Sequence, residues 1–258
     1  MRTLAALSTV NDPRTQHLCA RGFLIFTARE KGRADLVGRR PAQQALYNMV
    51  HVEDDRTLIV VGKAVCNMLA DEHSCMSAVH SGAMACLKII ATVDSEDLRE
   101  CVARVIVDLS FVPAAHMHMK NQPLIETACL ILCRSVGYGK VCAVGAILAL
   151  SQLKSFRVGM VQRHCVSAMV TTALHGRIKA SGVLSKMCRC LYNLSFTFFS
   201  ENLVAKDHCL LLLHMMYHDP ECSTADVQLM AGVLMNLTMA QPDAGTLERV
   251  CCTIIQQN

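Results

Sequence analysis

One short motif recurs along the whole chain and constrains the fold more than any other feature. Its clearest copies centre on an asparagine between apolar residues, and the other copies hold a different residue in the same apolar template. We call the central positions slots; they are Ile25, Asn67, Asp108, Ala149, Asn193 and Asn236, and their spacings are 42, 41, 41, 44 and 43 residues. A nearly constant period of this length indicates a repeat architecture, in which each unit packs mainly on its neighbours.

The residues around each slot follow a helical period. Counted from the slot, positions −6, −3, −2 and +1 share one face of a helix, because residues three and four apart lie one above the other. Across the six copies 23 of these 24 positions are apolar, the exception being Gly22, whereas apolar residues make up 52% of the chain. The motif is therefore predicted to be an amphipathic helix with this face buried.

Between consecutive slots the sequence has room for two further helices. After Asn67 a short helix is expected near Ser74–His80, followed by a tight turn at Ser81–Gly82 and a second helix. Asp94–Ser95 offers an N-cap for the slot-bearing helix that begins near Glu96. Apolar stretches recur at the corresponding place in later repeats, at Val161–Leu174 and Val204–Met216. Each repeat is thus predicted to hold three helices, the last of which carries the slot.

Three helices in about 42 residues, closed by a helix with a central Asn, resemble the armadillo repeat. The best match is Met76–Ser110, where Ser-Gly-Ala precedes an apolar run, an acidic loop and a long helix. HEAT repeats have a similar length, but the recurrent Asn favours armadillo. The resemblance implies an all-α, right-handed superhelix of about six repeats of 41–44 residues with three helices each, covering residues 1–258 as one solenoid.

In the armadillo family the third helix lines a concave groove, and its Asn pairs with the backbone of an extended peptide. The residues at slot −4 are Arg21, Lys63, Arg104, Gly145, Arg189 and Gly232. Import receptors of this family carry Trp there, and this chain has no Trp. Four cations suit an acidic or phosphorylated partner, as in catenin-like grooves. The predicted groove residues are Arg21, Lys63, Asn67, Arg104, Asp108, Arg189, Asn193 and Asn236.

Other interpretations of these residues stay open. Cations on a helix are often just a solvated face, and the Asn side chains could tie the third helix to a neighbouring loop instead of touching a ligand. The alternatives to a peptide-binding scaffold are a structural subunit of a cytoskeletal or ciliary assembly that docks by its ends or convex face, and an enzyme with a Cys/His site. A net charge of +4 is too small to indicate nucleic acid.

No motif in the sequence indicates a metal or cofactor, and we expect neither. His116–Met119 is interpreted as a surface loop, and Gly137–Lys140 as a turn too short to cradle phosphate. Neither Cys-x-x-Cys nor His-Glu-x-x-His occurs. The odd number of cysteines, 15, favours a reducing compartment. We therefore expect a soluble protein in the cytoplasm, or alternatively one in the nucleus or on the cytoskeleton, without membrane insertion.

The two ends of the chain suggest incomplete repeats. Leu4–Val10 is only a fragment of a unit, and Leu247–Gln256 would leave apolar residues partly uncovered. Solenoids normally finish in polar capping units. The chain is accordingly expected to be part of a longer protein, or to have its terminal faces covered by another subunit.

Overall fold

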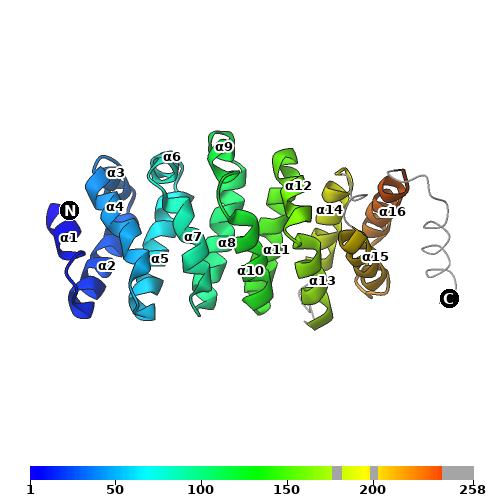
Figure 1. Ribbon diagram of the computed structural model, residues 1–258, viewed down its shortest axis with the longest axis horizontal. Helices are drawn as coiled ribbons and strands as arrows, with labels where there is room; N and C mark the ends of the chain where they lie inside the picture. The colour runs from blue at the N-terminus through cyan, green and yellow to red at the C-terminus, as the bar shows by residue number, and fades with distance from the viewer. Residues whose placement is uncertain (176–181, 198–202, 240–258) are drawn as a thin grey trace. The chain divides into compact units, whose positions relative to one another are not determined.

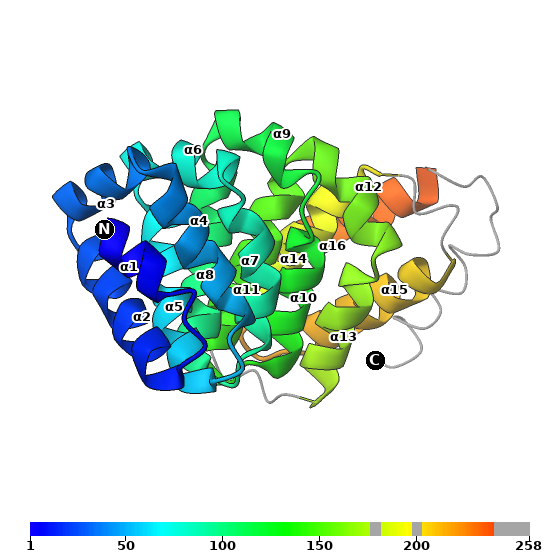
Figure 2. The same cartoon turned by 60° about the vertical axis from the view of Figure 1, so that its left-hand side comes forward.

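The computed structural model describes residues 1–175, 182–197 and 203–239, and every regular element in these ranges is a helix. Leu247–Gln256, the segment predicted to be uncovered, lies outside them. The chain forms two compact units, residues 1–131 and 132–258, and each is described by itself. Figures 1 and 2 label the helices.

Unit 1 contains a dense series of short and long helices. They are α1 (Arg2–Leu7), α2 (Pro13–Thr27), α3 (Glu30–Val37), α4 (Arg40–Asn48), the 3-10 turn η1 (Met49–His51), α5 (Asp55–Ala70), α6 (Glu72–His80), α7 (Ala83–Thr92), α8 (Glu96–Ser110), the 3-10 turn η2 (Pro113–Ala115) and α9 (His116–Met119). The next helix, α10 (Leu124–Arg134), contains the boundary between the units. The long helices α2 and α5 pack directly on each other, and α5 packs on α8 (Figures 1 and 2).

Unit 2 continues the same pattern. Its helices are α11 (Gly137–Gln152), α12 (Lys154–Gln162), α13 (Cys165–His175), α14 (Val183–Ser195), α15 (Leu203–Tyr217) and α16 (Thr224–Met239). Here α14 packs on both α11 and α16. The three-helix prediction is confirmed for the four inner repeats. The first repeat, in which Leu4–Val10 was expected to be only a fragment of a unit, holds α1 and α2, and the described residues of the last repeat form α15 and α16.

All six slots lie on the predicted helices, namely α2, α5, α8, α11, α14 and α16, which we call the third helices. The predicted apolar face is buried in each of them. Only Gly22, Phe26 and Leu234 of its 24 positions are half-buried rather than buried. Burying this face against neighbouring helices removes apolar surface from water and holds consecutive repeats together.

Side-chain caps begin several of the helices. Asp12, Asp54 and Asp71 each accept a hydrogen bond from the backbone N–H three residues later, at the starts of α2, α5 and α6. Ser95 does the same for α8, so the predicted N-cap at Asp94–Ser95 is confirmed and Ser95 is the capping residue. Each cap satisfies a backbone donor that has no partner inside the helix.

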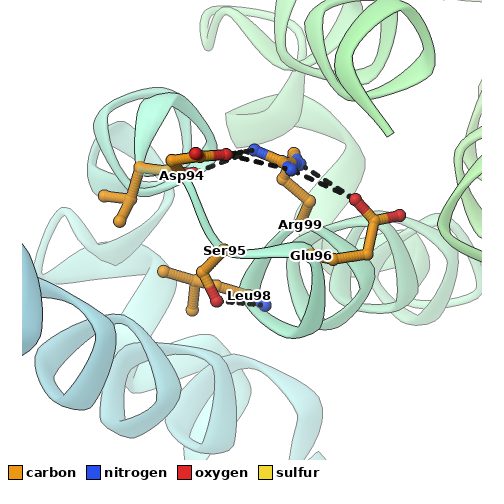
Figure 3. Close-up of polar contacts among 6 residues, drawn as sticks. Asp94, Ser95, Glu96, Leu98 and Arg99 are labelled. Atoms are coloured by element: carbon orange, nitrogen blue, oxygen red, sulfur yellow. Dashed lines mark hydrogen bonds and ion pairs between the residues drawn. The ribbon is translucent and has the colours of Figure 1, made fainter. Parts of the chain in front are cut away.

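A buried arginine holds the turn that enters α8. Arg99, whose side chain is 8% exposed, donates to the backbone carbonyl of Val93 at 3.1 Å and reaches the carboxylates of Asp94 and Glu96 at 3.4 and 3.1 Å. Figure 3 shows its guanidinium between the two carboxylates, above the Ser95 cap. The Arg99 side chain and the Ser95 cap therefore both hold the turn between α7 and α8.

Two local predictions need correction. His116–Met119 is not a surface loop: it forms α9, with Met119 fully buried and His116 Nε2 2.8 Å from the carbonyl oxygen of Ser110. The buried Met119 and the contact to the preceding helix explain why this stretch is ordered. Gly137–Lys140 is not a turn between helices but the first turn of α11, entered through Gly137 at φ 49°.

No single described helix is both long and apolar enough to cross a membrane. Two pairs of consecutive helices, α6 with α7 and α11 with α12, are long and apolar enough when each pair is taken together. The two pairs bend by 92° and 120° at their connections.

Candidate interaction surface

The predicted groove residues all lie on third helices, on the side away from the buried face. Unit 1 holds five of them on α2, α5 and α8, and unit 2 holds three on α14 and α16. Arg21, Arg104, Asp108 and Arg189 are exposed, whereas Lys63 and the three Asn are half-buried. Because these helices pack on each other within each unit, the structure brings the predicted residues of a unit onto adjoining helices.

The three slot asparagines share one structural role. Each donates its Nδ2 to a hydroxyl on the preceding third helix. The pairs are Asn67 with Thr27 at 3.4 Å, Asn193 with Ser151 at 3.0 Å, and Asn236 with Ser195 at 2.9 Å. The prediction that an Asn ties the third helix to a neighbour is thus supported, except that the neighbour is a third helix and not a loop.

The hydroxyl partners always stand two residues after the preceding slot. Each also donates to the carbonyl three residues before it, so it serves as both donor and acceptor. The slot after Asn67 holds Asp108 instead of Asn. The residue two positions after Asn67 is Leu69, which has no hydroxyl to accept from a slot amide. Within each unit, an Asn therefore occupies the slot where the preceding third helix provides a hydroxyl acceptor.

Cationic or imidazole side chains close the same helix ends. Eight residues after three of the slots, Arg33, His116 and Arg157 each contact the carbonyl oxygen of the hydroxyl-bearing residue, all at 2.8 Å. Arg33 also pairs with the Asp71 cap at 2.7 Å. Donors at a helix C-terminus satisfy free carbonyls and complement the helix dipole.

Sequence reasoning missed both the hydroxyls and these donors. A signal for the first was present, because five of the six slots are followed two residues later by Ser or Thr. The donors at slot +8 recur in only three repeats and vary between Arg and His, so they are visible only in the structure.

The cations at slot −4 differ in their surroundings. Lys63 lies 3.7 Å from Asp97 on α8, and Arg104 pairs with Glu100 one turn earlier in its own helix. Arg21 and Arg189 are exposed and make no ion pair within the described part of the chain. Partial burial raises the pKa of Asp108, while the nearby Arg104 opposes this shift. Among the slot −4 cations, Arg21 and Arg189 are therefore the two without an ion pair in the described residues, although Arg189 acts electrostatically on Asp226.

Most described thiols are buried, and burial disfavours their reactive form. Desolvation raises the pKa of Cys86 to about 11 and those of Cys188 and Cys209 to about 12. It also raises the pKa of Cys66. Because the thiolate is the nucleophile, these side chains act as small apolar residues of the core. Among the described residues no group of three or more His, Cys, Asp or Glu could hold a metal ion.

No protein-family model and no curated protein matches the chain, but solved structures do. A computationally designed armadillo repeat protein for modular peptide recognition superposes with a TM-score of 0.66 at 12% identity, covering 91% of this chain and 98% of its own. An engineered protein from a structural genomics consortium gives 0.65 at 16% identity, covering 92% and 96%. A designed armadillo repeat protein in complex with the peptide (KR)4 gives 0.63 at 11% identity, covering 91% and 98%. The chain therefore has an armadillo-like repeat fold; the right-handed sense of its superhelix stays a prediction.

Proposed function

We propose that this armadillo-like solenoid is a non-enzymatic scaffold that binds an extended, acidic segment of a partner protein along its third helices. The observation that carries the proposal is an exposed arginine in each unit, Arg21 in unit 1 and Arg189 in unit 2, each one helical turn before a slot and without an ion pair in the described residues. An unpaired guanidinium can bind a carboxylate or phosphate through two parallel hydrogen bonds.

The slot asparagines supply the second element of recognition. Their Nδ2 atoms are held by the preceding repeat, which fixes the amide plane at no cost to a ligand. The Oδ1 atom of each half-buried amide makes no hydrogen bond to another described residue and is an acceptor for a peptide N–H. Preorganised acceptors of this kind favour the binding of an extended peptide backbone, whatever the sequence of the peptide.

The sign of the charge distinguishes this chain from one of the designed proteins of the same fold. That protein is solved with the basic peptide (KR)4. Here Arg21, Lys63, Arg104 and Arg189 stand at slot −4, so a basic peptide would meet repulsion. We expect an acidic peptide to bind and (KR)4 not to bind.

The raised pKa values of the buried thiols support a non-enzymatic role. A hydroxyl–imidazole contact does exist, with Ser167 Oγ 2.7 Å from His208 Nδ1, but it joins α13 to α15 as a bond between neighbouring repeats. A cavity of about 480 Å³ lies in unit 1, where its lining includes Ser8, Gln16 and Asp54, and it does not include this pair.

The test compares peptide binding by the wild-type chain and by the double variant Arg21→Glu plus Arg189→Glu. Fluorescence anisotropy with labelled (DE)4 and (KR)4, together with selection from a random dodecapeptide phage library, reports both affinity and charge preference. We expect acidic sequences to be enriched by the wild type and to lose about tenfold or more in affinity for the double variant.

A matched control carries the same change of charge elsewhere. Lys88 on α7 and Lys154 on α12 are exposed and lie off the third helices, so Lys88→Glu plus Lys154→Glu should leave acidic peptides bound. Enrichment of basic peptides, or equal losses in both double variants, would overturn the proposal. In that case docking by the ends or the convex face, as in a cytoskeletal or ciliary assembly, becomes the better hypothesis.

A further inference from the structure

An aromatic pair lies at the C-terminal end of α14, beside the predicted groove residues of unit 2: Tyr192 is in its last turn and Phe196 is its C-cap residue. The rings of Tyr192 and Phe196 meet edge to face, with centroids 5.0 Å apart and planes at 84°. Phe196 is nevertheless 56% exposed. A pair of this geometry is a favourable arrangement of aromatic rings, so it holds a large apolar side chain in a fixed position at the surface.

The neighbouring repeat makes room for this pair. A Cβ atom added to Gly232 on α16 would lie 2.8 Å from Cε2 of Tyr192, closer than side chains tolerate. Gly232 occupies slot −4, the position that carries a cation in four other repeats. The Tyr192 ring thus takes the space that a slot −4 side chain would fill, and glycine at this position permits it.

This arrangement is particular to α14. Aromatic residues at both slot −1 and slot +3 occur in one of the six third helices; the pairs elsewhere are Leu24 and Ala28, Cys66 and Ala70, Val107 and Phe111, Leu148 and Gln152, and Met235 and Met239. An aromatic patch formed by Tyr192 and Phe196 is therefore a local feature of unit 2 and does not follow from the repeat.

The patch continues directly from the polar recognition elements. Arg189 and Asn193 lie on α14, and Phe196 is its C-cap residue with αR backbone angles, so their spacing of i, i+4 and i+7 places them on one face. Seven residues of helix span about 10 Å, which an extended peptide covers in about three residues. A cation, an amide and a supported aromatic ring lie within that reach.

We infer that the acidic partner segment also carries a bulky apolar side chain within about three residues of a carboxylate, and that Phe196, supported by Tyr192, holds it. This inference rests on the proposed function and adds the apolar half of the partner's recognition motif. The charge of Arg189 favours acidic segments over others. The aromatic patch favours those acidic segments that carry a bulky apolar side chain.

The experiment uses the same random dodecapeptide library, selected on the wild type and on Phe196→Ser. We expect wild-type selections to pair Asp or Glu with Phe, Leu, Met or another large apolar residue within three positions. Selections on Phe196→Ser should keep the acidic residues and lose the apolar preference. Replacing the apolar residue of a selected peptide by Ser should weaken wild-type binding about tenfold and binding to Phe196→Ser less than twofold.

Two further variants decide whether the effect belongs to the patch. Phe196→Leu keeps apolar bulk and should restore most of the preference, whereas Tyr217→Ser removes an aromatic residue on α15 that is 45% exposed and should change nothing. Acidic selections without an apolar residue would overturn this inference and leave the proposed function standing. Selections without acidic residues would overturn the proposed function itself.

Discussion

Asn193 Nδ2 donates a 3.0 Å hydrogen bond to the hydroxyl of Ser151, which lies 42 residues earlier on the preceding third helix. The hydroxyl in turn donates to the carbonyl of Leu148 at 2.7 Å. Through Ser151, the Asn193 side chain is therefore linked to the backbone of the preceding repeat. It orients the amide whose oxygen is proposed to meet a partner peptide.

Ser151→Ala should lower the free energy of unfolding by about 1 kcal/mol more than Ser110→Ala. Both hydroxyls are buried and bond to the carbonyl three residues before them, but only Ser151 also accepts from a slot Asn. Urea denaturation followed by circular dichroism measures the difference. Equal losses in the two variants would mean that the bond between repeats contributes no stability.

Arg99→Met should be far more costly than Arg104→Met, although both residues lie on α8. Arg99 is 8% exposed, and its guanidinium bonds to the Val93 carbonyl and to the carboxylate of Glu96, so the loss of these charge-assisted bonds should cost about 2 kcal/mol. Arg104 is 58% exposed and pairs with Glu100 one turn earlier in the same helix, where solvent screens the interaction, so its loss should cost at most about 0.5 kcal/mol. Thermal and urea unfolding of the two variants test the order, and a reversed order would contradict the role of Arg99 in the turn.

His164→Gly should stabilise the chain by roughly 0.5–1 kcal/mol. His164 has φ 59° at the turn between α12 and α13, where the equivalent turn of an earlier repeat has Gly82 at φ 95°. Glycine reaches this region without the penalty of a Cβ, although it gains more freedom in the unfolded chain. The matched variant Gly82→Ala, whose new Cβ would meet nothing within 4 Å, should destabilise. A loss of stability in His164→Gly would indicate that the imidazole makes a contribution larger than the strain.

Unit 1 should lose stability in acid through its helix caps. The hydroxyl of Thr57 and then its backbone N–H lower the pKa of Asp54 below its ordinary value of 3.8. A carboxylate with a lowered folded-state pKa stabilises the fold above the unfolded-state value, and this contribution is lost as the pH falls through the folded-state value. The stability difference between wild type and Asp54→Asn should therefore be constant between about pH 7 and 5 and shrink below 3.8. Urea titrations at each pH measure it, and a difference that does not shrink at all as the pH falls below 3.8 would contradict the cap assignment.

Iodoacetamide at neutral pH should modify the exposed Cys133 long before the buried thiols. Burial raises the pKa of Cys188 to about 12, so little thiolate forms at that site. Mass spectrometry of peptides after timed labelling locates the modified residues, with urea-unfolded chain as the control in which all thiols react. Early labelling of Cys188 would point instead to an activated cysteine and revive the enzymatic alternative.

The repeat period and the apolar face of the third helix were determined by the sequence alone. Both depend on spacing along the chain, since burial every three or four residues dictates a helix and a fixed interval of 41–44 residues dictates stacking. The Ser95 cap could be predicted for the same reason, because a cap and its helix are neighbours in sequence.

The tertiary structure decided which of the predicted groove residues bond to other residues of the chain. Asn193 and Ser151, or Lys63 and Asp97, meet only when third helices pack on each other, and no local pattern states that distance. The same holds for Gly232: the sequence places a glycine at slot −4, but only the packing of α16 on α14 brings Tyr192 against it. Periodicity within the chain specifies each helix, whereas the partners of a side chain are specified by packing between helices, where residues about 40 positions apart become neighbours.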